Sequence, residues 1–204
     1  MSIFITFEGV EGCGKSTQAK ALYRRLKRQN LPVLLTYEPG GTKLGARIRR
    51  LLKKATGIDM VSEAELFLFL SSRAQLVREV IRPNLDRGTM VVCDRYAGST
   101  LAYQGYGLGL KLPEIVAANR LATAGLEPDL IILMDLNPET GLRRKSEGDD
   151  DRFEQRELDF HRRVRNGYLE MAAAEPSRWF VVDASMGKKE IEKAIWGKVS
   201  GLLK

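Results

Sequence analysis

The stretch Gly9-Val10-Glu11-Gly12-Cys13-Gly14-Lys15-Ser16 decides how the chain folds, because it matches the P-loop pattern of glycine, four residues, glycine, lysine and serine or threonine. An apolar run over residues 3–7 precedes it, and residues 17–29 carry apolar side chains at helical spacing. The local order is therefore predicted to be strand, glycine loop, helix. The alternative is a glycine-rich turn that only closes a βα unit.

This loop has the chemistry of a phosphate cradle. Glycines let successive backbone N–H groups turn inward, and the N-terminus of the next helix adds partial positive charge. Lys15 supplies a mobile cation, and the Ser16 hydroxyl is a suitable ligand for Mg²⁺ bridging phosphate oxygens. The residues predicted to bind nucleotide phosphates are Gly9, Val10, Glu11, Gly12, Cys13, Gly14, Lys15, Ser16 and Thr17.

Length and composition indicate one globular domain over residues 1–204. Hydrophobic residues make up 44% and charged residues 29%, and no apolar run approaches the roughly 18 residues of a membrane span. The chain enters a strand without the features of a signal peptide, so we expect a cytoplasmic protein without a membrane partner. Cys13 and Cys93 fit no disulfide or zinc framework and are predicted to be free thiols.

The net charge is +7, but lysine and arginine are spread over several predicted helices without interleaved aromatic residues. We therefore expect no nucleic-acid partner. Two interpretations stay open, a solvated basic surface and a local field suited to small polyanions such as nucleotides.

Strands alternate with helices along the chain. The fold class is therefore α/β, a three-layer α/β/α arrangement of P-loop NTPase type with a five-stranded parallel sheet. A capping-box pattern, Ser62 with Glu65, begins one long helix, and Pro83 is expected to end it. Later strands are predicted at 32–37, 89–93, 129–135 and 179–183, and later helices near 44–52, 62–82, 113–125, 138 onward, 152–174 and 188–203.

Several residues outside the loop are candidates for a site. Asp94 follows a predicted strand, at the edge where parallel sheets bind ligands, and could hold Mg²⁺ through water. Phe69 and Arg73 are four residues apart and so share one helical face, which an aromatic ring and a hydrogen-bond donor need in order to bind the same flat heterocycle.

Residues 142–156 are rich in charge and are predicted to form a helical lid. His161, the only histidine, is expected at the surface without a chemical role.

Six blocks of sequence together resemble the bacterial thymidylate kinases, P-loop nucleoside monophosphate kinases that phosphorylate dTMP to dTDP in dTTP synthesis. They occur in order and span most of the chain. They are 7–17 (FEGVEGCGKST), 38–42 (EPGGT), Phe69 with 73–75 (RAQ), 94–96 (DRY), 99–105 (STLAYQG) and 151–154 (DRFE).

The resemblance implies ATP as phosphoryl donor, Mg²⁺ as cofactor, dTMP as acceptor and a homodimer, formed through the helix of residues 63–82 and its neighbours. Phe69 would stack on thymine and Arg73 would donate to its O4. The implied dTMP-binding residues are Glu11, Glu38, Phe69, Arg73, Arg95, Thr100, Tyr103 and Gln104, with Arg95 on the acceptor phosphate.

The resemblance also assigns catalysis. Gly12 stands where some members of the family carry a catalytic arginine, so a lid arginine is expected instead. The catalytic set is Lys15 and Arg95 with Arg143, Arg144 or Arg152, which the sequence does not rank. Tyr37 and Cys13 depart from the family pattern. A kinase for another nucleoside monophosphate or small acceptor, an ATP-binding regulatory module and a nucleic-acid-binding protein stay as alternatives.

Overall fold

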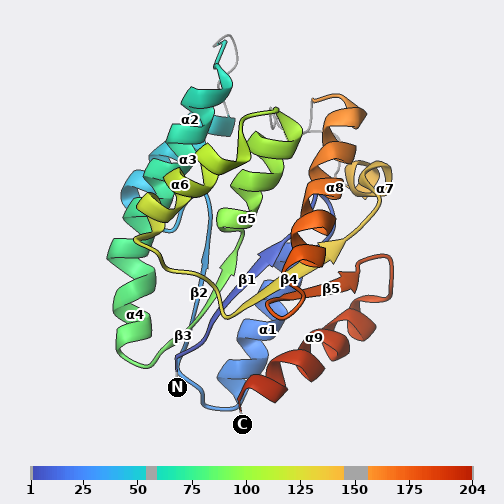
Figure 1. The fold of residues 1–204 in the computed structure, drawn as a ribbon. Helices are drawn as coiled ribbons and strands as arrows, with labels where there is room; N and C mark the ends of the chain where they lie inside the picture. Colours follow the sequence, from blue (N-terminus) through green and yellow to red (C-terminus); the bar gives the residue numbers. More distant parts are fainter. Residues whose placement is uncertain (1, 54–58, 145–155, 204) are drawn as a thin grey trace.

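Five parallel strands form the central layer of the structure, a computed structural model that describes residues 2–53, 59–144 and 156–203 (Figure 1). Their order is β2-β3-β1-β4-β5, and central Ile5 pairs with Val92 on one side and Leu130 on the other. The glycine loop therefore leaves the middle of the carboxyl edge. The strands are β1 (Phe4–Glu8), β2 (Val33–Tyr37), β3 (Met90–Asp94), β4 (Leu130–Asp135) and β5 (Trp179–Asp183).

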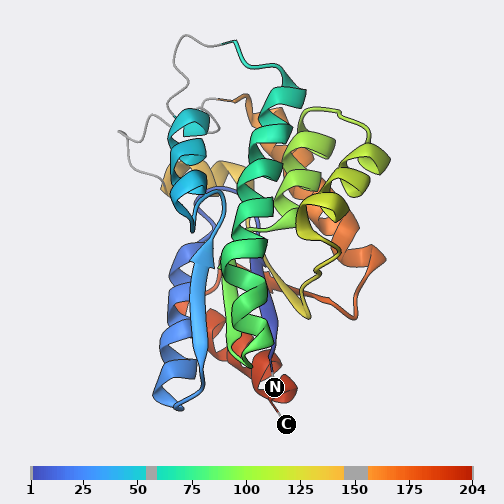
Figure 2. The ribbon, with the colours of Figure 1, turned by 90° about the vertical axis from the view of Figure 1, so that its left-hand side faces the viewer.

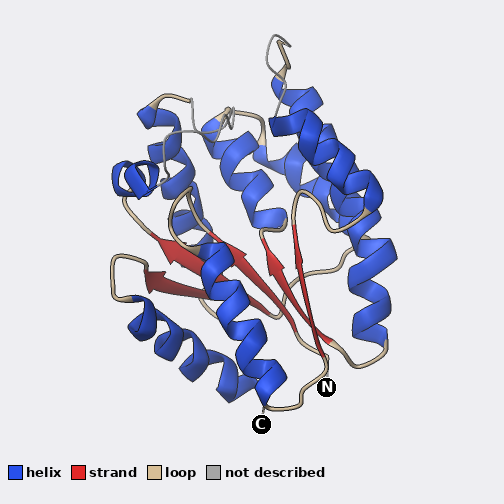
Figure 3. Cartoon of the chain, turned by 180° about the vertical axis from the view of Figure 1, so that it is seen from behind, coloured by secondary structure: helices blue, strands red, loops and turns tan. Residues whose placement is uncertain are grey.

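Helices cover both faces of this sheet (Figures 1 and 3). α1 (Lys15–Arg28) and α9 (Lys188–Leu202) pack against each other on one face. The other face carries α2 (Lys43–Lys53), α3 (Ser62–Leu76), α4 (Arg82–Asp86), α5 (Ala97–Thr100), α6 (Leu112–Thr123), α7 (Pro138–Arg144) and α8 (Leu158–Ala174). Right-handed crossovers explain this division. The chain runs from central β1 to β2 in one direction, which puts α1 on one face. It then runs through β3, β4 and β5 in the opposite direction, which puts the connecting helices on the other face. The predicted α/β class and parallel five-stranded sheet are confirmed.

The sheet is the centre of the hydrophobic core. Ile5, Phe7, Val92 and Ile132 are fully buried, as expected for strands covered on both faces. Burying each such side chain contributes about 1.5–3 kcal/mol relative to exposure. The core therefore fixes the carboxyl edge on which the polar loops stand. Among the described residues, no helix is long and apolar enough to cross a membrane.

Pro83 does not end the long helix, contrary to the sequence prediction. α3 passes through a π-helical segment, η1 (Val77–Ile81), into α4, so that one helical run extends beside the sheet (Figure 2). Proline lacks an N–H and its ring clashes with the carbonyl four residues earlier. The wider π turn before it relieves that clash, because its hydrogen bonds join residues five apart.

A second π-helical segment, η2 (Leu101–Gly107), continues from α5 in a stretch where the sequence predicted no helix or strand. The capping-box interpretation of Ser62 and Glu65 is also wrong. Val61 occupies the N-cap position of α3 without a side-chain cap, and the Glu65 side chain is buried and directed elsewhere. The proposed lid over 142–156 lies outside the described residues except for 142–144 and 156.

Candidate functional site

A cavity of about 590 Å³ opens at the carboxyl edge of the sheet. Its lining joins the glycine loop to residues from β2, α3, β3 and η2. The predicted residues that border it are Glu11, Gly12, Gly14, Lys15, Ser16, Thr17, Glu38, Phe69, Asp94, Arg95, Thr100, Tyr103 and Gln104. The fold thus brings most of the predicted nucleotide and acceptor contacts around one space.

The glycine loop is shaped by its backbone. Gly12 has φ 67°, and a Cβ there would lie 1.9 Å from the carbonyl oxygen of Gly141 in α7. A larger residue at position 12 would therefore displace α7. Lys15 Nζ donates to the carbonyl oxygens of Gly9 at 2.9 Å and Val10 at 2.6 Å, so its ammonium group lies within the curve of the loop.

Ser16 and Asp94 meet across the site, although 78 residues separate them. The Ser16 hydroxyl donates a short hydrogen bond to the Asp94 carboxylate. Both groups offer hard oxygen atoms, which suit Mg²⁺. No cluster of three His, Cys, Asp or Glu residues able to hold a metal occurs in the described part of the chain. This donor set fits an ion held mainly by substrate phosphates and water, with one or two protein ligands.

Glu11 is the centre of a polar cluster at the loop. Its Oε1 accepts hydrogen bonds from Arg95 at 3.0 Å and from the Tyr103 hydroxyl at 2.5 Å. Burial alone would raise the pKa of Glu11, but the nearby His161 ring and the charges of Arg95 and Lys15 outweigh burial and hold this pKa well below its usual range. Glu11 is therefore a fixed negative charge beside the cavity.

Arg95 is held in a demanding backbone conformation, with φ 72°, which non-glycine residues adopt rarely. Its Nη1 donates to the Gly9 carbonyl at 3.2 Å and to Ser99 at 3.1 Å. Contacts from the loop and from α5 thus orient the guanidinium group toward the cavity, where a planar donor suits a phosphate.

The prediction that His161 lies at the surface is wrong. Its side chain is 1% exposed, and its Nδ1 lies 3.5 Å from Glu11 Oε2. Its place in a basic helical run suggested exposure, but His161 lies on the buried face of α8, where its ring and that of Phe160 pack edge to face at 5.3 Å between centroids. Neither ring nitrogen has a hydrogen-bond partner among the described residues.

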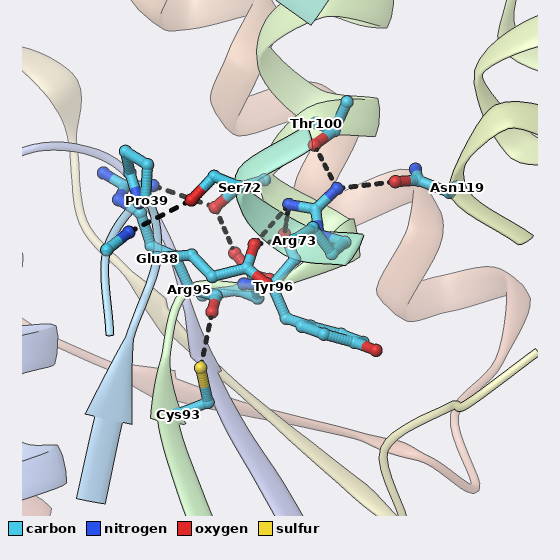
Figure 4. Close-up of polar contacts among 12 residues, drawn as sticks. Glu38, Pro39, Ser72, Arg73, Cys93, Arg95, Tyr96, Thr100 and Asn119 are labelled. Atoms are coloured by element: carbon cyan, nitrogen blue, oxygen red, sulfur yellow. Dashed lines mark hydrogen bonds and ion pairs between the residues drawn. The ribbon is translucent and has the colours of Figure 1, made fainter. Parts of the chain in front are cut away.

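Arg73 stands in a buried network rather than on the cavity wall (Figure 4). Its Nη1 donates to Thr100 at 2.7 Å and to Asn119 at 2.6 Å. Its Nε donates to Glu38 at 2.8 Å, and Nη2 contacts both Glu38 at 2.6 Å and the Tyr96 carbonyl at 2.9 Å. All five N–H groups of this guanidinium therefore have partners.

Glu38 and Glu8 share this buried region. Burial raises the pKa of Glu38 to about 7, against the opposing charge of Arg73. Burial also raises the pKa of Glu8, although Ser99, Tyr96 and Tyr168 donate hydrogen bonds to its carboxylate. At the carboxyl edge the pKa of Glu11 is therefore lowered while the pKa values of Glu8 and Glu38 are raised. Shifted pKa values of this kind are common at functional sites.

Gln104 reaches the cavity from η2. Its amide nitrogen donates to Glu65 Oε1 at 2.8 Å, and Glu65 Oε2 accepts from Arg156 at 2.7 Å. Glu65 is 1% exposed. Sequence reasoning did not identify Glu65 or Arg156 as parts of the site, because their contacts come from three separate elements.

Two of the predicted lid arginines, Arg143 and Arg144, do not border the cavity. Arg143 Nε donates to the Glu139 carbonyl at 3.3 Å, and Arg144 Nη1 donates to the Ala184 carbonyl at 3.1 Å. Arg152 lies outside the described residues. Three residues of the glycine loop are not part of the cavity lining, namely Gly9, Val10 and Cys13.

Tyr37, which departs from the family pattern, also borders the cavity. The Arg49 guanidinium lies 5.5 Å from the centre of the Tyr37 ring, and Arg49 borders the same cavity. Arg49 is one of several arginines on α2, and its orientation toward the cavity could not be read from the sequence. It places a further cation near the glycine turn at Gly40, beside the predicted acceptor contacts.

The family model for thymidylate kinase matches residues 7–195 of this chain. The chain belongs to the thymidylate kinase family. It is 52% identical over 204 residues to a thymidylate kinase of Dehalococcoides mccartyi, a match that covers 100% of this chain and 99% of the relative. A thymidylate kinase of Deinococcus radiodurans is 49% identical over 199 residues, with coverage of 97% and 96%.

Membership of the thymidylate kinase family agrees with the three-dimensional comparison. A crystal structure of thymidylate kinase from Ehrlichia chaffeensis superposes with a TM-score of 0.80 at 32% identity and covers 100% of this chain and 99% of that chain. The resemblance expected from the six sequence blocks is confirmed.

Proposed function

We propose that this protein transfers the γ-phosphoryl group of ATP to the phosphate of dTMP, giving dTDP. The observation that carries the proposal is a single cavity bordered both by the P-loop and by Phe69, Thr100 and Gln104. A donor bound on the loop and an acceptor held by the second set would meet beside Arg95. Such positioning, with charge neutralisation, is what phosphoryl transfer requires of a protein.

In this proposal Lys15 and Arg95 act on the transferring group and the acceptor phosphate. Arg95 is preorganised by the loop carbonyl of Gly9 and by Glu11, so little rearrangement is needed when a phosphate arrives. Arg49 is added as a second phosphate contact, because it borders the cavity beside the glycine turn. Arg143, Arg144 and Arg152 stay as candidates for the lid arginine.

Mg²⁺ bound with ATP would be held by Ser16 and, through water, by Asp94. It would supply charge neutralisation on the phosphate oxygens. The hydrogen bond between these two side chains supports the assignment, because oxygen atoms in contact with each other are near enough to bind one small ion. Lys15 provides the remaining fixed positive charge on the loop.

Thymine recognition is assigned to Phe69, Thr100, Tyr103 and Gln104, which border the cavity. A direct hydrogen bond from Arg73 to thymine O4 remains part of the proposal, but all five N–H groups of Arg73 already have partners in the buried network. One of its N–H groups would have to exchange its present partner, such as Thr100, for the base. Otherwise Arg73 acts by holding Thr100 and Glu38 in place.

An acceptor panel tests this function. Purified protein with ATP and Mg²⁺ is assayed with dTMP, dUMP, dCMP and dGMP, and dTMP is expected to give the highest kcat/KM. Equal activity with dCMP would contradict the thymine assignment and favour another monophosphate kinase. Binding of ATP by calorimetry with no separate dTMP site would instead favour a regulatory module.

We also propose that the protein forms a homodimer and acts in the cytoplasm. The dimer is supported by exposed apolar side chains on two helices that pack together, α3 and α6, among them Phe67 at 61% and Leu121 at 85% exposure. The cytoplasmic location is supported by the substrates, because ATP and deoxynucleotides are used there, and cell fractionation checks it.

A further inference from the structure

We propose that Glu65 is a specificity-positioning residue, which sets the orientation of the Gln104 amide and so selects a base with an N3–H group. The inference rests on the proposed dTMP kinase function and adds a residue that neither the six sequence blocks nor the cavity lining includes. Glu65 acts through Gln104 and does not itself contact the base.

The contacts that carry the inference converge from three elements. Glu65 lies on α3, Gln104 lies in η2, and Arg156 lies just before α8. One carboxylate oxygen accepts from Gln104 Nε2 at 2.8 Å, and the other accepts from Arg156 Nη2 at 2.7 Å. Arg156 is itself stacked over the Phe160 ring at 4.6 Å, which fixes the cation that pairs with Glu65.

An ionised carboxylate accepts hydrogen bonds and cannot donate them. The nitrogen of the Gln104 amide must therefore face Glu65, and the carbonyl oxygen Oε1 is the amide atom left for a base in the cavity. Oε1 accepts from the N3–H of thymine or uracil. It repels the N3 lone pair of cytosine, so the buried hydrogen bond between Glu65 and Gln104 determines which base is accepted.

Burial gives this arrangement its strength. Glu65 and Gln104 are each 1% exposed, so water cannot easily replace either partner. A buried carboxylate that lost its donors would carry a large desolvation cost, which penalises the opposite amide orientation. Glu65 does not cap its helix, so its carboxylate is not required for the start of α3.

The test is Glu65→Gln. Arg156 can only donate, so it takes the new amide oxygen and leaves the new NH₂ group facing Gln104. Gln104 then turns its amide and presents nitrogen to the cavity. We expect the ratio of kcat/KM for dTMP to that for dCMP to fall at least about tenfold, the effect of one well-placed hydrogen bond. The KM for ATP is expected to stay unchanged.

Uracil provides an internal control, because dUMP shares the N3–H and O4 edge of dTMP and lacks only the methyl group. The ratio for dTMP to dUMP should not change in Glu65→Gln, whereas general damage to the pocket would alter it. Glu63→Gln makes the same chemical change at an exposed position of α3 and is expected to behave as wild type.

Two more variants keep the inference testable. Glu65→Asp retains the charge for Arg156 and shortens the reach to Gln104, so the dTMP to dCMP ratio should fall in the same direction even if Glu65→Gln folds poorly. In a Gln104→Met background, Glu65→Gln should change the ratio no further. Non-additivity of this kind is expected when one residue acts through another.

The outcomes separate the inference from the function. If wild-type protein phosphorylates dTMP and both Glu65 variants, folded by circular dichroism, keep the wild-type dTMP to dCMP ratio, the positioning role is wrong and the function stands. If wild-type protein does not phosphorylate dTMP, the proposed function itself fails. A fall in the dTMP to dCMP ratio with an unchanged dTMP to dUMP ratio supports the inference.

Discussion

Glu11 links the phosphate loop to three other parts of the chain at the scale of single residues. Arg95 follows β3, Tyr103 lies in η2 and His161 lies in α8, and all three contact the same carboxylate. The loop therefore does not act as an isolated phosphate cradle. Its acceptor side is fixed by side chains that come from up to 150 residues later.

Removal of the Arg95 side chain should lower turnover by at least about a hundredfold, because the reaction loses a preorganised charge contact. Arg95→Ala is compared with wild type in a coupled ADP-release assay at saturating ATP. Arg24→Ala, an exposed arginine on α1, is the matched control and should retain normal turnover. Near-normal turnover of Arg95→Ala would show that the acceptor phosphate is bound by another residue.

Acid should weaken the fold partly through Glu11. The pKa of this carboxyl is lowered in the folded protein from an ordinary 4.5, so folding favours the ionised form. Its stabilising contribution is complete above about pH 4.5 and is lost as the pH falls through the folded value. Glu11→Gln should therefore be less stable than wild type at pH 7, and the difference should shrink below pH 4.5.

Urea unfolding at a series of pH values measures this difference. Glu114→Gln is the control, because Glu114 is 70% exposed and its pair with Lys111 is a surface contact. Its stability difference from wild type should be small at every pH. A Glu11→Gln difference that stays constant from pH 7 to pH 3 would exclude Glu11 as an acid-sensitive group.

Site residues that belong to a sequence motif could be predicted, whereas site residues that depend on tertiary packing could not. Lys15 and Ser16 follow from a local pattern, because the loop chemistry needs them at fixed spacing. His161 and Glu65 are polar residues in helices, and sequence periodicity alone places such residues at the surface. Their burial depends on partners in other elements, Glu11 and Gln104, that no local pattern names.

At the scale of elements, α7 (Pro138–Arg144) packs its backbone directly on the phosphate loop. A Cβ on Gly141 would lie 2.2 Å from the Glu11 carbonyl oxygen, and one on Gly12 would lie 1.9 Å from the Gly141 carbonyl oxygen. Both contacts are to backbone atoms, which cannot move aside without shifting an element. The position of the loop therefore depends on a glycine in a different helix.

Gly141→Ala should destabilise the fold by about 1–3 kcal/mol, the usual cost of overpacking, and should raise the KM for ATP. Thermal unfolding and steady-state kinetics measure the two effects. Gly197→Ala on α9 is the matched control, because that glycine is exposed and has no atom within 4 Å of an added Cβ. It should be neutral or stabilise by about 0.5–1 kcal/mol. An unaltered Gly141→Ala protein would mean that α7 adjusts freely.

Regular elements were predicted from sequence where one local rule applied. All five strands were found, because each is a short, near-continuous apolar run, although only the three central strands, β3, β1 and β4, are buried on both faces. Pro83 predicted a helix end that is absent, since a π-helical turn at Val77–Ile81 lets the helix continue past it. η2 (Leu101–Gly107) was missed because two glycines and aromatic residues resemble a loop, while packing on α8 stabilises it as a helix.

At the scale of the whole molecule, strand order explains why residues far apart in sequence form one site. β1 and β3 are neighbours in the sheet, with Phe7 paired to Asp94. The glycine loop after β1 and the segment after β3 therefore begin side by side. Parallel strands with crossovers could be predicted from alternating elements, which is why Ser16 and Asp94 were both expected near one edge. Which other acids are buried at this edge depends on the helices that pack over it.

The exposed apolar side chains of α3 and α6 lead to a prediction about assembly. Phe67, Val116 and Leu121 are 61%, 52% and 85% exposed, on two helices that pack together through buried residues such as Leu66 and Ile115. A second copy covering them would bury apolar area from both chains and stabilise the dimer.

Leu121→Glu should shift the protein to monomer, with a dissociation constant raised at least about tenfold, because a charge would be buried without a partner. Sedimentation equilibrium measures the change, and Met186→Glu, an exposed apolar residue after β5, should leave assembly unaltered. A wild-type protein that sediments as a monomer at micromolar concentration would contradict the proposed dimer, and a dimeric Leu121→Glu protein would place the interface on another face.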